Sequence, residues 1–116
     1  MSEKKVIRLD ELAVRLRGIF EKYRIKQGMV FGSFARGEAS RHSDLDLLLI
    51  QVTDKPFLKR YEGILQEITQ TVSDRDIDLL IYTPQELTRL SHQRWIARIL
   101  QEGKIIYESE CEPTSS

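Results

Sequence analysis

Two segments of the chain decide its fold. Residues 32–37 read Gly-Ser-Phe-Ala-Arg-Gly, and residues 43–50 read Ser-Asp-Leu-Asp-Leu-Leu-Leu-Ile, starting ten residues after Ser33. The unbroken apolar run in the second segment predicts a strand that is buried on both faces. Side chains alternate between the two faces of a strand, so we expect Asp44 and Asp46 to project from the same face.

Two neighbouring carboxylates repel each other unless a cation lies between them. A third acid can come from the segment Asp-Ile-Asp-Leu-Leu-Ile at residues 76–81, if it pairs beside the first strand. Three carboxylates suit Mg²⁺ or Mn²⁺ better than zinc. Asp76 and Asp78 share one strand face, so the spacing leaves open which of them joins Asp44 and Asp46. The alternative is that Asp44 ends a turn and Asp46 is a solvated strand residue.

The glycine-serine turn before these acids suits a phosphate. At Gly32 the backbone can approach an anion where a Cβ atom would clash, and Ser33 can donate to a phosphate oxygen. Arg36 lies one helical turn further and could reach a triphosphate, or could form an ordinary surface ion pair. We expect Ser43 to orient the loop that carries Asp44. The alternative is an ordinary strand-to-helix turn in which Ser33 serves as the cap.

The remaining pattern predicts a small α/β (α+β) domain with a mixed sheet of about four strands and helices mainly on one face. Expected strands cover residues 25–31, 45–52, 77–82 and 104–107, and a short helical turn covers residues 33–37. Expected helices cover residues 10–23, 55–71 and 83–100, the last starting at the cap sequence Thr83-Pro84-Gln85-Glu86. The aromatic residues on these stripes are expected in the core rather than against a nucleobase: Phe57, Tyr61, Tyr82 and Trp95.

The composition narrows the class of protein. The 116 residues fit one domain at residues 1–108, followed by a disordered tail at residues 109–116. The 18 basic and 18 acidic residues cancel, which does not support nucleic acid as the primary ligand. The single Cys fits a reducing cytoplasm. Because the sequence lacks a signal-peptide core and any apolar run near about 20 residues, we expect no membrane association.

The glycine-serine turn, the Asp44-x-Asp46 pair and the later strand acid resemble the nucleotidyltransferase domain of the DNA polymerase β-like superfamily. Within it, the short chain is similar to the minimal nucleotidyltransferases, the MntA-like proteins, and the resemblance covers residues from about Val30 to Ile106. It implies a nucleotidyltransferase fold, ATP as substrate, and frequent pairing with a HEPN-domain protein. The resemblance also favours Asp78 as the third acid, because that acid lies within the apolar run in the family. We expect its apolar neighbours to bury Asp78.

The expected function is therefore metal-dependent transfer of a nucleoside monophosphate, AMP from ATP, to a hydroxyl of a partner protein. The resemblance further implies that the chain is the antitoxin of a HEPN toxin–antitoxin pair. One alternative is transfer to a small molecule or an RNA end. Another is a non-catalytic binding module that neutralises a HEPN partner by occlusion.

Overall fold

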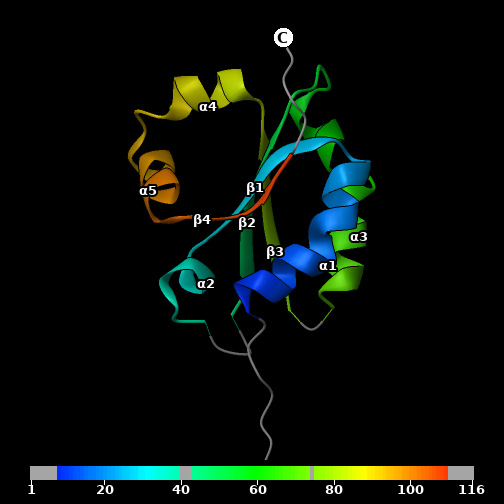
Figure 1. Ribbon diagram of the computed structural model, residues 1–116. Coiled ribbons are helices and arrows are strands. Elements are labelled where there is room, and N and C mark those ends of the chain that lie inside the picture. Colours follow the sequence, from blue (N-terminus) through cyan, green and yellow to red (C-terminus); the bar gives the residue numbers. More distant parts are fainter. Residues whose placement is uncertain (1–7, 40–42, 74, 110–116) are drawn as a thin grey trace, which may run out of the picture.

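A four-stranded mixed sheet forms the centre of the molecule (Figure 1). The structure is a computed structural model, and it describes residues 8–39, 43–73 and 75–109. The strands lie in the order β3-β2-β1-β4, with β1 antiparallel to both β2 and β4, and β2 parallel to β3. Their bounds are β1 Ile25–Phe31, β2 Leu45–Gln51, β3 Ile77–Tyr82 and β4 Lys104–Glu108. The predicted sheet and its four strands are confirmed.

Helices cover both faces of this sheet. Helices α1 (Leu9–Lys22) and α3 (Ile64–Thr71) pack on one face, and α4 (Pro84–Leu90) and α5 (Arg94–Glu102) pack on the other (Figure 1). The sequence-based expectation put the helices mainly on one face. The difference arises because β2 is apolar on both faces: Leu47 and Leu49 contact the first layer, whereas Leu48 contacts the second.

The predicted helix at residues 55–71 is divided. A 3₁₀ helix, η1 (Phe57–Tyr61), precedes α3, and Gly63 separates them with a φ of +81°. A Cβ atom at Gly63 would lie 2.6 Å from the hydroxyl of Tyr23, so this turn depends on glycine both for its backbone and for its space. The division leaves Leu58 79% exposed.

The predicted helix at residues 83–100 is divided as well. Thr83 caps α4 with the full capping box that the sequence predicts, but α4 ends at Leu90 and α5 begins at Arg94. The break changes which side chains face the sheet. Trp95 is 48% exposed, so its expected place in the core is wrong, and Ile96 and Ile99 are buried instead.

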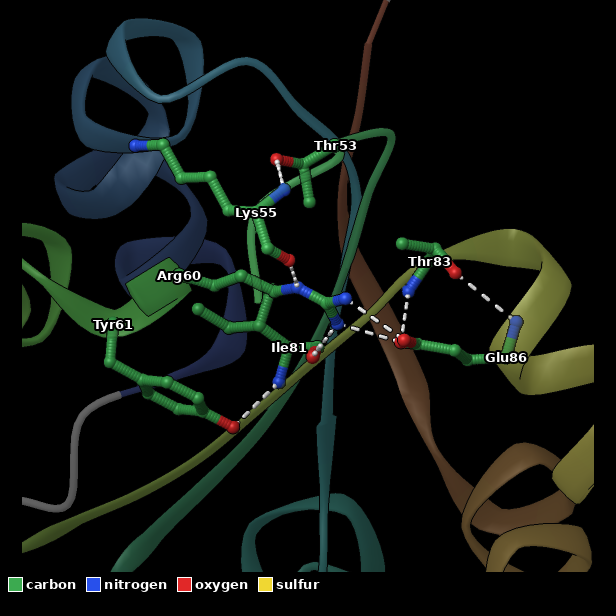
Figure 2. Close-up of polar contacts among 7 residues, drawn as sticks. All are labelled: Thr53, Lys55, Arg60, Tyr61, Ile81, Thr83 and Glu86. Carbon is green, nitrogen blue, oxygen red and sulfur yellow. Dashed lines mark hydrogen bonds and ion pairs between the residues drawn. The ribbon is translucent and has the colours of Figure 1, made fainter. Parts of the chain in front are cut away.

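A partly buried ion pair joins η1 to α4 at the end of β3 (Figure 2). Arg60 of η1 donates two hydrogen bonds to the Glu86 carboxylate, at 2.6 and 2.9 Å, and one to the carbonyl of Ile81. Glu86 also accepts a hydrogen bond from the amide of Thr83, so one carboxylate completes both the helix cap and the ion pair. These contacts fix η1 and α4 at the carboxyl end of β3.

Among the described residues, the structure has no helix that is long and apolar enough to cross a membrane. At the C-terminal side, the amide of Ser109 donates to the carbonyl of Lys26, so the first residue of the expected tail lies beside β1. The other tail residues, 110–116, lie outside the described residues.

The Arg60–Glu86 pair predicts a specific loss of stability in acid. Hydrogen bonding to Arg60 lowers the pKa of Glu86 from 4.5 to about 2. Because the folded pKa lies below the unfolded one, the stabilisation is present above pH 4.5 and disappears as the pH falls towards 2. We expect Glu86→Gln to lower the free energy of unfolding at pH 7 by about 3 kcal/mol. Urea unfolding between pH 2 and 7 tests this, and an unchanged pH dependence in the variant would contradict it.

Candidate active site

The acidic residues meet where β2 and β3 begin. The parallel register places Asp46 directly opposite Asp78, and Asp44 lies immediately before β2. The amide of Leu45 donates to the carbonyl of Asp76 at 2.9 Å, which continues the pairing beyond the strands. Asp46 and Asp78 occupy the same alternate positions as Leu48 and Leu80, so they lie on the face that α4 and α5 cover.

The exposure of these acids differs from the expectation. Asp46 is partly buried, whereas Asp44, Asp76 and Asp78 are exposed. The prediction that flanking apolar residues bury Asp78 is wrong. β3 is an edge strand of the sheet, and the apolar layer on this face contacts β3 from Leu80 onward, so Asp78 lies before it.

The environment of Asp46 disfavours its negative charge. Its pKa is raised from 3.8 to about 6, first by burial, then by its hydrogen bond with Asp78 and by the charges of Asp78 and Asp44. The charge of Arg36 acts in the opposite direction. Asp78 therefore lies close enough to share a site with Asp46. This geometry favours Asp78 over Asp76 as the third acid, and the assignment stays a prediction.

Gly32 lies directly against the side chain of Asp46. Its backbone has a φ of +73°, and a Cβ atom built on it would collide with a carboxylate oxygen of Asp46. Gly32 is thus required by the position of Asp46 and by the turn itself. Ser33 begins α2 (Ser33–Arg36) directly after this contact, so the glycine-serine turn and the acids are brought together.

Arg36 borders a groove that opens beside the acids. It forms ion pairs with Glu38 at 3.0 Å and with Glu102 of α5 at 3.7 Å. The groove has a volume of about 950 Å³ and extends from Gly32 and Arg36 along α5 to Trp95. Its other polar lining is Arg94, Arg98, Gln101 and Glu102. A groove with three arginines and an exposed indole suits a ligand that carries negative charge and an aromatic ring.

The three candidate acids offer oxygen ligands for a divalent cation. Within the described part of the chain, no three His, Cys, Asp or Glu side chains are already close enough together to hold a metal ion. Asp46 and Asp78 are hydrogen-bonded to each other, and the negative charge of Asp44 contributes to the raised pKa of Asp46. Asp44 immediately precedes the strand and is exposed. Carboxylate oxygens and mutual repulsion both fit Mg²⁺ or Mn²⁺.

Ser43 is held by its backbone. Its carbonyl accepts a hydrogen bond from Arg75 at 3.0 Å. Sequence reasoning passed over Arg75 because a single basic residue between acids in a short loop carries no distinctive pattern. It also placed Trp95 in the core. The interruption at Ser91-His92-Gln93 could have indicated that Trp95 is exposed, because it shifts the helical phase after Leu90.

The polymerase beta nucleotidyltransferase family matches residues 15–112, which include the turn and all the candidate acids. The chain belongs to this family. It is therefore a nucleotidyltransferase, as the sequence predicts.

Three known proteins are similar to this chain over most of its length. A relative from Methanocaldococcus jannaschii, provisionally named a protein adenylyltransferase, is 24% identical over 92% of this chain and 100% of its own. The fold resembles that of a toxin–antitoxin complex with AMP-PNP, with a TM-score of 0.63, 19% identity and coverage of 84% and 74% of the two chains. It also resembles a complex of the tri-AMPylated Shewanella oneidensis HEPN toxin with its MNT antitoxin, with a TM-score of 0.58, 14% identity and coverage of 88% and 74%.

We expect Asp78→Asn to lower the pKa of Asp46 from about 6, although not fully to 3.8, because burial remains. The raised pKa means that Asp46 destabilises the metal-free fold above about pH 6, and that this cost disappears as the pH falls towards 3.8. Asp78→Asn should consequently raise metal-free stability at pH 7. Carboxyl NMR titration in EDTA measures the pKa. Asp76→Asn is the control, and a larger effect from that variant would exchange the two roles.

We expect Gly32→Ala to abolish nucleotide transfer, because the new methyl group displaces the Asp46 carboxylate. Gly37→Ala is a matched control: Gly37 has the same φ of +73°, but a Cβ atom there meets nothing within 4 Å. Both variants should lose about 1–3 kcal/mol of stability through backbone strain. Transfer rate and melting temperature, measured together, separate the two effects. Equal activity in both variants would show that the Gly32–Asp46 contact is unimportant.

Proposed function

We propose that this nucleotidyltransferase uses ATP and Mg²⁺ or Mn²⁺ to transfer AMP to a hydroxyl of a partner protein. The observation that carries the proposal is the pairing of Asp46 with Asp78 beside the Gly32–Ser33 turn, next to the basic groove. The provisional name of the archaeal relative, protein adenylyltransferase, supports a protein as the acceptor.

In this proposal, the triphosphate lies at the turn and the nucleoside lies in the groove. Gly32 leaves space for the Asp46 carboxylate beside the phosphates, Ser33 donates to the phosphates, and Arg36 exchanges its Glu38 or Glu102 partner for a phosphate oxygen. Trp95 offers its exposed ring to the base, and Arg98 lies one helical turn further along the same side of α5. Gly32, Arg36, Trp95 and Arg98 all line the groove.

Asp44, Asp46 and Asp78 hold the cation. When bound, it neutralises charge on the α-phosphate and on the leaving pyrophosphate. The acceptor oxygen forms a bond to the α-phosphorus, and the bond from that phosphorus to the oxygen bridging to the β-phosphate breaks. Asp78 is exposed on the open side of the pair, so it can take the proton of the incoming hydroxyl.

We further propose that the acceptor belongs to a HEPN-domain toxin and that this chain acts as its antitoxin in the cytoplasm. The support is the fold shared with an MNT antitoxin in complex with an AMPylated HEPN toxin.

The test is co-expression with the product of the reading frame adjacent to the gene, followed by incubation with Mg²⁺ and ATP labelled at its α- or γ-phosphate. We expect the α-label alone to enter the partner, and Asp46→Asn to reduce labelling by at least about a hundredfold, since the central ligand is lost. Asp54→Asn is the matched control, because Asp54 is an exposed acid after the opposite end of β2.

Other outcomes point to the alternatives. Binding and neutralisation of the partner by Asp46→Asn, without labelling of the partner by the wild type, would indicate occlusion. Label in an RNA or small-molecule fraction would indicate a different acceptor. Incorporation of the γ-label would overturn nucleotidyl transfer.

A further inference from the structure

Arg75 connects the segments that carry the acids and the turn. It lies one residue before Asp76, at the start of the β3 segment, and only 9% of its surface is exposed. Its Nη1 atom donates to the carbonyl of Ser43, the residue before Asp44. Its guanidinium also lies over the ring of Phe34 in α2, 5.1 Å from the centroid. One side chain therefore contacts the turn helix and the loop to Asp44 from the segment that leads to Asp78.

These contacts act on the least constrained of the three acids. Asp46 and Asp78 are fixed by the strand register, whereas Asp44 precedes β2. The backbone around Asp44 is held on both sides: the Ser43 carbonyl by Arg75, and the Leu45 amide by the carbonyl of Asp76. Both partners come from adjacent residues of one segment, so a shift of Arg75 moves both attachments.

We propose that Arg75 is a positioning residue, which sets Asp44 at the distance from Asp46 and Asp78 that a divalent cation requires. The inference rests on the proposed metal site. A guanidinium suits this role because it can donate to a carbonyl in its plane while its face packs on an aromatic ring. Lysine keeps the charge but cannot make both contacts with one planar group. Partners that orient ligands in this way affect metal affinity by roughly 10–100-fold.

The chain contains a matched control at the opposite end of β3. Arg60 is 8% exposed, donates to the carbonyls of Lys55 and Ile81, and lies 5.6 Å from the ring centroid of Phe57. It has similar burial, a carbonyl contact and a ring contact, and it also pairs with Glu86, but it meets β3 only at Ile81, beyond Asp78, and contacts neither the loop to Asp44 nor α2. Arg60→Lys therefore reports the cost of altering a buried arginine, without an effect on the acids.

The experiment compares wild type, Arg75→Lys and Arg60→Lys in two measurements on the metal-free full chain. Hydrogen exchange at the Leu45 amide reports the position of the Asp44 backbone, and titration with Mn²⁺, followed by EPR, reports affinity without nucleotide or turnover. We expect Arg75→Lys to speed Leu45 exchange and to weaken Mn²⁺ binding about 10–100-fold. Arg60→Lys should lower the melting temperature and change neither quantity.

A second pair of variants keeps the test valid if Arg75→Lys folds poorly. Phe34→Leu removes the ring beneath Arg75, and Phe57→Leu removes the ring beneath Arg60. Only Phe34→Leu should weaken Mn²⁺ binding. Wild-type Mn²⁺ affinity in folded Arg75→Lys or Phe34→Leu would overturn the positioning role. Failure of the wild type to bind Mn²⁺ would overturn the metal site of the proposed function, and unchanged Leu45 exchange in Arg75→Lys would separately overturn the role of Arg75.

Discussion

The parallel pairing of β2 with β3 is the constraint on which the site depends. It places Asp46 opposite Asp78 while Leu47 and Leu49 enter one core and Leu48 enters the other. A shift of one residue would exchange the faces of every side chain on the strand, and would bury an acid in place of a leucine. The apolar core therefore maintains two carboxylates in contact despite their repulsion. Because the packing of the core fixes this arrangement, the pKa of Asp46 stays raised.

This repulsion explains why a second set of contacts is needed at the edges of the site. Gly32 provides room for Asp46, and Arg36 provides a positive charge near it. The opposite end of β3 is different, because there Arg60 and Glu86 satisfy each other directly. The Arg60–Glu86 ion pair therefore stabilises the fold at that end of the strand. At the other end the carboxylates of Asp46 and Asp78 repel each other, and such repulsion favours the binding of a cation.

The sequence predicts the strands closely because their signals are local. Apolar runs, the Thr83 capping box and the alternation of Asp44 and Asp46 depend on residues close in the chain. The division at Gly63 depends on a tertiary contact, because Gly63 adopts its turn against Tyr23. The break after Leu90 has a local signal in Ser91-His92-Gln93, but the packing of α5 on the second face does not follow from that signal. The exposure of Asp78 likewise follows from the position of β3 at the sheet edge, which the order of strands along the chain does not specify.

The burial of Arg60 and Arg75 likewise depends on tertiary contacts and not on local sequence. In the sequence, Arg60 follows a lysine and Arg75 lies between acids, so both resemble solvated surface charge. The fold buries both, and each then requires carbonyl acceptors and a ring to replace its hydration. At Arg60 these partners connect helices, and the result is stability. At Arg75 the carbonyl partner precedes a candidate metal ligand and the ring belongs to α2, which follows Gly32, so the cost of burying the charge is coupled to the geometry of the candidate site.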